Sequence, residues 1–388
     1  MTITPKSVLN FFSSYGLACV VLTLLLILTF LGTLEQTQHG LFEVQNKYFN
    51  SLFLVHWLFD TVPIPLPGAY LLSGILLINL ICGAIIRAPK SWKRPGMLIA
   101  HCGIIYMLFS GFVTYHYSTR GHMTLYPEES SSEYKSFTDW EIAITDIGKP
   151  GKEYVIPGES FLKLDAGQEV TFHHAGLPFD LRLSGICKNA TIRKAAVDEL
   201  GAIDGVMIQE LPLEKQAERN IAAAIATVDS GGTVRQGVLW GFSETPMTKG
   251  PWVAEAGDSK YSIDLRHTTF EVPFTITLDK FNRDLHPGTG MAANFESEVT
   301  KREGGVERKV NIRMNEPLRH KGYTFFQASW GPENAQPGEP LFSTFEVVNN
   351  PADQWPLYSC IVISIGLLIH FLQKLLGYLL QESRRRTA

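Results

Sequence analysis

Cysteine patterns that carry redox or metal chemistry are missing from this sequence. It holds five cysteines, and no two of them form a CxxC pair: Cys19, Cys82, Cys102, Cys187 and Cys360. The lack of CxxC excludes a thioredoxin-like dithiol site, and the lack of CxxCH excludes covalently attached haem on the chain itself. Their spacing also does not match a zinc site.

Common catalytic motifs are absent as well. We find no nucleophile elbow, P-loop, HExxH or dinucleotide fingerprint in the 388 residues. The formal net charge is -4, and no basic patch is interleaved with aromatic residues, which argues against nucleic acid as a partner.

Hydrophobic residues make up 45% of the chain and are concentrated in a few blocks. Four uncharged or nearly uncharged blocks are about long enough to cross a hydrocarbon core of roughly 30 Å: residues 15–34, 69–86, 97–115 and 357–380. The first block is too long for a signal peptide and lacks a small-x-small site before Glu35, so we interpret it as an uncleaved anchor.

Basic residues predict the orientation of these spans. Four of them lie in the loop 87–96, and Arg384, Arg385 and Arg386 lie in the tail 381–388. The positive-inside rule then places both termini in the cytoplasm, with residues 35–68 and 116–356 outside.

The long external region 116–356 is predicted to be an all-β domain, either a sandwich or barrel-like. Strand-like segments such as "WEIAITDI", "FDLRLSGI", "PFTITLDKF" and "YTFFQASW" alternate with turn segments such as "PGES" and "HPGTG". Residues 208–228 are ambiguous between a short helix and a strand. In the loop 35–68, aromatic residues at near-helical spacing predict an amphipathic helix on the outer membrane surface.

Two histidines fall inside the apolar blocks. His101 lies near the start of the third block and His370 lies in the fourth, so both are expected in the inner half of the membrane. Polar groups there usually face protein or a cavity, and imidazole is a haem-iron ligand. Each ring could instead bond a backbone carbonyl or a serine, and Gly103 could admit a flat ring or pack a helix. Arg87, Lys90, Lys93 and Arg94 could meet haem propionates or only set the topology.

The remaining histidines show no metal-ligand spacing beyond the pair His173 and His174, which point to opposite faces of a strand. They are therefore interpreted as surface or interface residues. Composition and spacing thus reach a four-span membrane protein with an external β-domain and a candidate haem ligand.

Several segments resemble the ResB (also CcsB) family of cytochrome c biogenesis proteins. They are "RMNEPLRHKGYTFFQASW" at Arg313–Trp330, "FTITLDKFNRDLHPGTG" at Phe274–Gly290, "LGTLEQ…GLFEVQNKYFNSLF" near the N-terminus, and "LIAHCGI" around His101. The family more often has Tyr at the positions of His320 and Phe326.

The resemblance implies a subunit of the system II cytochrome c synthase rather than an enzyme alone. With a membrane partner of the CcsA (ResC) type, it would carry haem b transiently across the membrane and support thioether attachment to the CxxCH of apocytochrome c. His101 would match the family's transmembrane haem-ligand histidine, whereas His370 matches no family position. A thioredoxin-like reductant, membrane lipid and the bacterial inner membrane complete the expected setting, with the thylakoid membrane as the alternative.

Two other readings stay open at this point. The chain could be a cofactor-free, membrane-anchored assembly factor that binds protein alone. It could also be a b-type cytochrome that relays electrons, with His101 and His370 facing one another.

Overall fold

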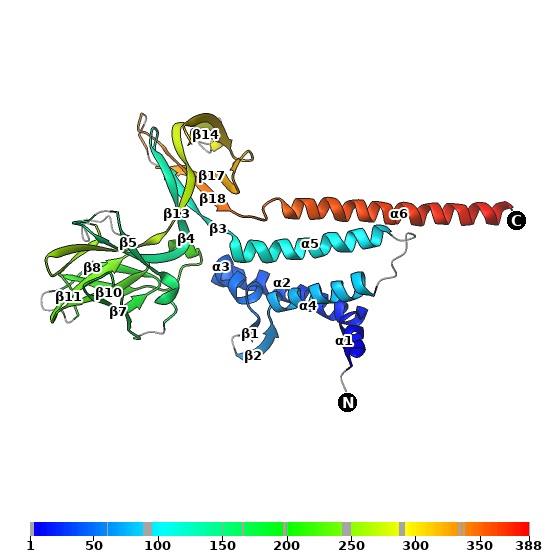
Figure 1. Ribbon diagram of the computed structural model, residues 1–388, viewed down its shortest axis with the longest axis horizontal. Helices are drawn as coiled ribbons and strands as arrows, with labels where there is room; N and C mark the ends of the chain where they lie inside the picture. The colour runs from blue at the N-terminus through cyan, green and yellow to red at the C-terminus, as the bar shows by residue number, and fades with distance from the viewer. Residues whose placement is uncertain are drawn as a thin grey trace. The chain divides into compact units, whose positions relative to one another are not determined.

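The structure, a computed structural model, describes residues 4–59, 61–87, 95–149, 151–164, 167–196, 199, 201–242, 250–286, 292–332, 335–336 and 338–387. The chain divides into two compact units (Figure 1). The helical unit consists of Met1–Ser118 and Asn349–Ala388, and the β-rich unit consists of Thr119–Val348. The predicted fold class, four candidate membrane helices with a large β-domain, is confirmed.

Four helices in the described part of the helical unit are long and apolar enough to cross a membrane. They are α2 (Tyr15–His39), α4 (Ala69–Leu80) continued by the π-helix η2 (Ile81–Ile86), α5 (Pro95–Tyr117) and α6 (Trp355–Thr387). A short helix α1 (Pro5–Phe12) precedes them. Ser14 caps α2 by accepting a hydrogen bond from the Leu17 amide at 3.2 Å, which separates α2 from α1.

The segment between α2 and α4 differs from the helix predicted for it. Helical structure is confined to α3 (Leu41–Val44) and the π-helix η1 (Gln45–Phe49), and a β-hairpin follows, with β1 (Phe53–Leu58) paired to β2 (Val62–Pro67). Prolines at 63, 65 and 67 exclude a helix over β2, because proline in a helix interior removes a hydrogen bond and clashes with the preceding turn.

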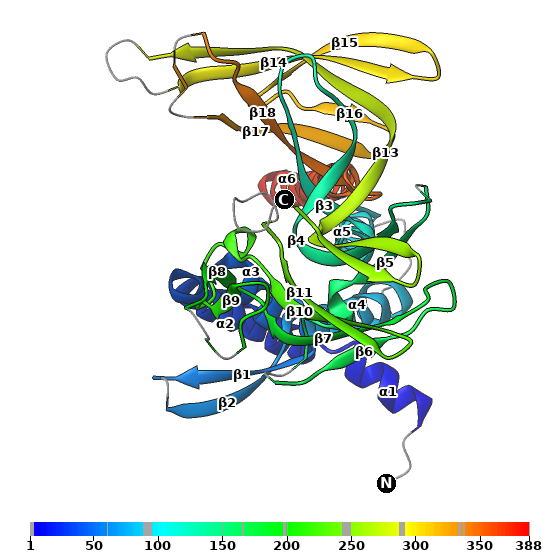
Figure 2. The same cartoon turned by 90° about the vertical axis from the view of Figure 1, so that its left-hand side faces the viewer.

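The described strands of the β-rich unit form a ten-stranded sheet, a four-stranded sheet and a separate hairpin (Figure 2). Their bounds are β3 (Thr119–Leu125), β4 (Ser130–Asp146), β5 (Glu153–Pro157), β6 (Val170–Phe172), β7 (Asp180–Cys187), β8 (Ala190–Lys194), β9 (Val206–Glu210), β10 (Ala223–Ser230), β11 (Thr233–Trp240), β12 (Trp252–Ala256), β13 (Ser259–Leu285), β14 (Ala292–Glu303), β15 (Val306–Arg313), β16 (Leu318–His320), β17 (Tyr323–Gly331) and β18 (Phe342–Asn349). The short 3-10 helices are η3 (Gly158–Ser160) and η4 (Ala217–Arg219).

Pairing in these sheets is antiparallel. The large sheet runs β15-β14-β13-β4-β3-β18-β17-β16, with β12 on β13 and β5 on β4, and the small sheet runs β11-β10-β7-β6. Strands β8 and β9 form the separate hairpin. The ambiguous stretch 208–228 contains the end of β9, the 3-10 helix η4 and the start of β10, so it is mainly extended.

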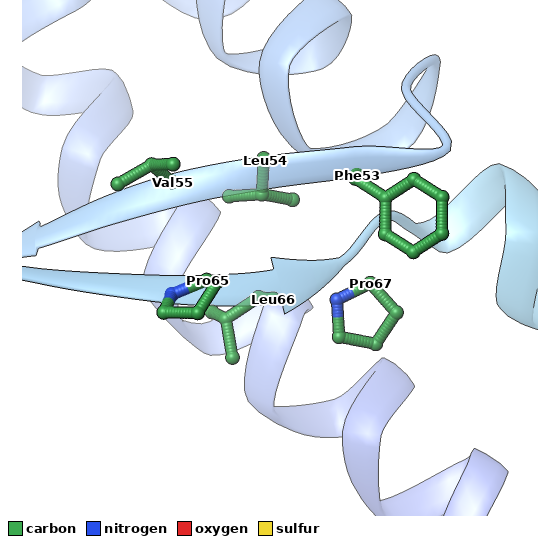
Figure 3. Close-up of a pocket in the computed structure, with 6 residues that line it drawn as sticks. All are labelled: Phe53, Leu54, Val55, Pro65, Leu66 and Pro67. Carbon is green, nitrogen blue, oxygen red and sulfur yellow. The ribbon is translucent and has the colours of Figure 1, made fainter.

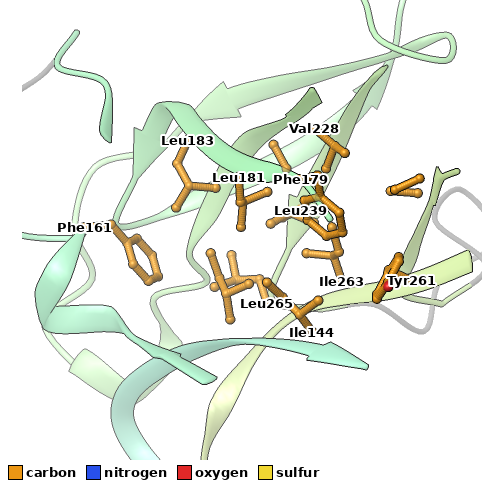
Figure 4. Close-up of a cluster of buried hydrophobic side chains, with 14 of the residues drawn as sticks. Ile144, Phe161, Phe179, Leu181, Leu183, Val228, Leu239, Tyr261, Ile263 and Leu265 are labelled. Atoms are coloured by element: carbon orange, nitrogen blue, oxygen red, sulfur yellow. The ribbon is translucent and has the colours of Figure 1, made fainter. Parts of the chain in front are cut away.

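Two hydrophobic cores share the two longest strands, β4 and β13. In core 1, Ile144 and Leu265 of these strands pack against Leu181 of β7, Val228 of β10 and Leu239 of β11 (Figure 4). Core 2 uses the other ends of β4 and β13 together with residues of β3 and of β14–β18, among them Tyr134, Phe274, Val299, Phe325 and Phe345.

A register shift between His267 and Thr269 separates the two halves of β13. Before it, the buried residues have odd numbers (Ile263 and Leu265), and after it they have even numbers (Val272, Phe274 and Ile276). Between these two pairs β13 has one residue and β4 has four, so the extra residues bulge out of β4. On either side of this irregularity, β13 turns residues of opposite parity towards the two cores.

Candidate functional site

His101 lies in the second turn of α5 and is half-buried. Its Nδ1 atom lies 2.7 Å from the main-chain oxygen of Met97, one turn earlier in the helix. A carbonyl oxygen can only accept, so Nδ1 carries the ring proton and Nε2 keeps its lone pair. Nε2 has no hydrogen-bond partner in the part of the chain that the structure describes. The carbonyl bond predicted as the alternative to metal ligation therefore orients the ring as a metal-ligating histidine requires.

Helices α5 and α6 touch backbone to backbone beside His101. A Cβ atom on Gly96 would lie 2.4 Å from the Gly366 carbonyl oxygen and 2.5 Å from the His370 amide nitrogen. A Cβ atom on Gly103 would lie 2.7 Å from Cγ1 of Ile363. Gly103 therefore packs helices together, and no flat ring fits between α5 and α6 at these positions.

The side chain of His101 does not take part in the contact between α5 and α6. Ala100 faces α6, since its amide nitrogen is 2.5 Å from where a Gly366 Cβ atom would lie. His101 is one residue further, roughly 100° around the helix. A haem bound at its Nε2 would therefore approach α5 from a face other than the one that α6 covers, which suits a site completed by another polypeptide.

The backbone of His370 on α6 lies beside Gly96 of α5. The contact between Gly366 and Ala100 lies one helical turn further along α5. Five residues separate Gly96 from His101, so the two histidines are roughly 7 Å apart along the helix axis. The His370 ring makes an edge contact with Phe371, at 5.7 Å between centroids. The structure therefore brings the two helices together without stacking the two imidazoles.

The basic loop predicted near the haem is partly described. The guanidinium of Arg87 donates a hydrogen bond to Oγ of Ser13 at 2.9 Å, so it connects η2 to the start of α2. Lys90, Lys93 and Arg94 lie outside the described residues.

A polar cluster at the end of α2, the Glu35 cluster, was not predicted. The Glu35 carboxylate accepts hydrogen bonds from Lys47 Nζ, at 2.5 Å, and from the hydroxyl of the fully buried Tyr48. Nδ1 of His56 lies 2.6 Å from the same hydroxyl and 3.5 Å from the carboxylate. Burial and the Glu35 carboxylate raise the pKa of Tyr48, so it stays protonated and ties α2, η1 and β1 together.

A second group of histidines lies in the β-rich unit at the register shift between β13 and β4. His267 stacks on Trp140 at 3.8 Å between centroids, and the His122 ring lies 6.4 Å away at 81°. The Nδ1 atoms of both histidines are buried without a hydrogen-bond partner. Burial, followed by the neighbouring His122, lowers the pKa of His267 to about 4. The sequence analysis interpreted these histidines as surface or interface residues, and both are half-buried beside the register shift between β13 and β4.

Metal and thiol chemistry find little support in the described residues. They contain no group of three or more His, Cys, Asp or Glu side chains that could hold a metal ion. All five cysteines are free thiols, and burial raises the pKa of Cys187, which disfavours the reactive thiolate.

These observations define a protein with four candidate membrane helices, a β-rich unit and a half-buried histidine, His101, whose Nε2 atom has no hydrogen-bond partner among the described residues. The ResB-like family model matches residues 227–339, which include both β-domain segments that carry the resemblance. Similar proteins include the cytochrome c biogenesis protein CcsB of Synechococcus sp. (strain CC9902), 35% identical over 18% of this chain. The CcsB proteins of Prochlorococcus marinus strains NATL1A and NATL2A are 34% and 40% identical over 25% and 18% of the chain.

Together, the family model and these relatives support the resemblance of the chain to the ResB/CcsB family. The matched segments span 16% of the length of the Synechococcus relative and 21% and 16% of the two Prochlorococcus relatives.

Proposed function

We propose that this chain is a membrane subunit of a cytochrome c biogenesis complex. With a CcsA/ResC-type membrane partner it carries haem across the membrane and supports thioether attachment to the CxxCH of apocytochrome c. The family match in the β-rich unit supports the biogenesis role, because the relatives are named cytochrome c biogenesis proteins. The β-rich unit then lies on the periplasmic side of a bacterial inner membrane, with both termini in the cytoplasm.

The observation that carries the haem part of the proposal is the fixed tautomer of His101. Its Nδ1 proton is committed to the Met97 carbonyl, and its Nε2 lone pair is available to haem iron. Because α6 covers a different face of α5, the second axial ligand comes from the partner. This chain thus supplies one imidazole to haem b that is held transiently between the two proteins.

His370 has a weaker claim to the same role. It is displaced along the helix axis from His101 and its backbone is packed against Gly96. His370 remains a candidate haem ligand. At the observed spacing, it is not expected to share an iron with His101.

The β-rich unit is proposed to hold apocytochrome c while the thioether bonds form. Terminal strands of a sheet can pair with an extended peptide, and β11 pairs with β10 alone among the described strands. The chain has no CxxC pair of its own, so a separate thioredoxin-like protein would keep the CxxCH thiols reduced.

The haem proposal is tested by substituting His101→Ala in the complex purified with its partner. We expect the haem content per complex to fall several-fold and the bis-imidazole absorption spectrum to be lost, because one axial ligand is missing. Added imidazole should restore both, since it can fill the space that the substitution leaves.

Cys102→Ala is the matched control, because Cys102 is the next residue on α5 and its side chain is exposed. It should leave the haem content and spectrum unchanged. An unchanged spectrum in His101→Ala would instead favour a cofactor-free assembly factor. A loss of axial ligation in His370→Ala alone would favour the b-type electron relay.

A further inference from the structure

The hairpin β1–β2 sits at the outer end of two candidate membrane helices. It follows α2, which ends at His39, by way of α3 and η1, and α4 begins at Ala69, two residues after β2 ends. Both views show the hairpin extending sideways from the helices, across their long axes (Figures 1 and 2). A hairpin in this direction lies along the membrane plane if α2 and α4 cross the membrane.

The exposed surface of the hairpin strands is apolar. Phe53 is 73% exposed, Trp57 52% and Phe59, at the turn, 86%. A shallow groove of about 540 Å³ crosses it and is lined by Phe53, Leu54, Val55, Pro65, Leu66 and Pro67 (Figure 3). Strands β1 and β2 carry no Lys, Arg, Asp or Glu side chain, and the one charged residue between them in the sequence is Asp60. Exposed strands of this composition suit immersion in an apolar medium.

Three prolines close the outer edge of β2. Pro63, Pro65 and Pro67 pair with Trp57, Val55 and Phe53, and the Gly68 amide bonds to the Leu52 carbonyl at 2.7 Å. The amide positions at 63, 65 and 67 therefore point away from β1, where proline has no N–H group. This removes donors that would be costly to leave unpaired in lipid, and it disfavours pairing with a strand of another protein.

The Glu35 cluster fixes the position of the hairpin relative to the end of α2. His56, in the middle of β1, turns its ring inward to the hydroxyl of Tyr48, which in turn donates to Glu35 in the last turns of α2. The hairpin is thereby attached to the end of a candidate membrane helix by buried polar contacts. Its apolar side chains are left to face outward.

We propose that the β1–β2 hairpin inserts its aromatic side chains into the outer interfacial layer of the lipid bilayer. Aromatic residues favour this layer, where the hydrocarbon meets the headgroups. The occupant of the apolar groove is then lipid, rather than a partner protein or a second copy of the chain.

The test places a nitroxide label on Val62→Cys in the full-length protein, with the five native cysteines replaced by Ala. Val62 is 52% exposed at the start of β2. In nanodiscs of phosphatidylcholine and phosphatidylglycerol, collisions with oxygen report lipid and collisions with a water-soluble nickel chelate report water. We expect the label at Val62 to meet oxygen more than nickel.

Two positions calibrate this measurement. Leu368→Cys on α6 is 60% exposed on a candidate membrane helix, and Val306→Cys is 69% exposed at the start of β15. The Val62 label should fall between them and nearer to Leu368. A value equal to that at Val306 would overturn the proposal, and protection from both reagents would show that protein covers the hairpin instead.

A second measurement uses the unlabelled chain. Brominated phosphatidylcholine should quench the tryptophan fluorescence of the wild-type protein more strongly than that of Trp57→Phe, because Trp57 would lie within reach of the lipid bromines. Equal fractional quenching of the two proteins would contradict lipid insertion of the hairpin.

Discussion

Histidine shows how strongly a single residue depends on its surroundings in this chain. His101 donates Nδ1–H to a carbonyl and keeps Nε2 open, whereas His267 is stacked on Trp140 with its Nδ1 buried and unpaired. The first arrangement suits a metal ligand, and the second destabilises the protonated ring. The same side chain therefore suits the proposed iron ligation in one unit and predicts acid sensitivity in the other.

Acid should destabilise the β-rich unit through His267. Its ordinary pKa is 6.5, and the folded pKa is about 4, lowered by burial, by His122 and by Lys135 against a smaller opposing effect of Asp139. Below pH 6.5 the unfolded chain takes up a proton that the folded chain does not, so stability falls as the pH drops towards 4. At 1.36 kcal/mol per pKa unit, the loss reaches about 3 kcal/mol and then levels off.

His267→Phe should remove most of this pH dependence, because it keeps the stacking on Trp140 without a titrating group. Urea unfolding of the protein in detergent, followed by tryptophan fluorescence between pH 7 and pH 4, measures it. His173→Phe is the control, since His173 is exposed and paired with Asp180. If both variants kept the wild-type slope, the pH dependence would arise elsewhere.

Sequence alone could single out His101, because an imidazole in an apolar run has few explanations. It could not find the Glu35 cluster or the register shift at His267. Glu35, Tyr48 and His56 are joined by a helix end, a π-helical turn and a strand, whose meeting depends on packing. His122 and His267 are 145 residues apart and meet through the β-bulge.

At the scale of elements, local patterns predicted the strands well and the loop before α4 less well. The segments "FDLRLSGI" and "YTFFQASW" correspond to β7 and β17 within one residue at each end. In the loop, aromatic spacing favoured a helix, but the alternate prolines at 63, 65 and 67 are compatible with an edge strand and not with a helix interior. The 27 residues of β13 were not predicted as one strand, because its pattern changes phase at the bulge.

The contact between α5 and α6 gives a prediction at this scale. Gly366→Ala would place a Cβ atom 2.5 Å from the Ala100 amide nitrogen and 2.7 Å from the Gly96 carbonyl oxygen, so the helices must separate. We expect a loss of about 1–3 kcal/mol, as for other overpacked sites, seen as a lower melting temperature in detergent.

Gly377→Ala is the matched control on the same helix, since nothing lies within 4 Å of the added Cβ atom. Alanine favours a helix over glycine by about 1 kcal/mol, so this variant should melt at the same temperature or slightly higher. Equal destabilisation by both substitutions would mean that α5 and α6 are not closely packed.

At the scale of the whole molecule, the proposed division of work assigns haem to the helical unit and the protein client to the β-rich unit. A photo-cross-linking residue at Val234, 57% exposed near the start of β11, should capture apocytochrome c in the assembled complex. The same residue at Ile147, 51% exposed in the turn after β4, is the control and should capture much less. Equal capture at both sites would argue against strand addition at β11.

The two strands common to both cores have a mechanical consequence for the β-rich unit. Each of β4 and β13 runs as one continuous ribbon from one packed interior to the other. Unfolding of either core would disrupt β4 and β13, which the other core also needs. The β-rich unit should therefore unfold in one cooperative step. Force that a bound client exerts on one core would then reach the other core through β4 and β13. The register shift at His267 lies on that path.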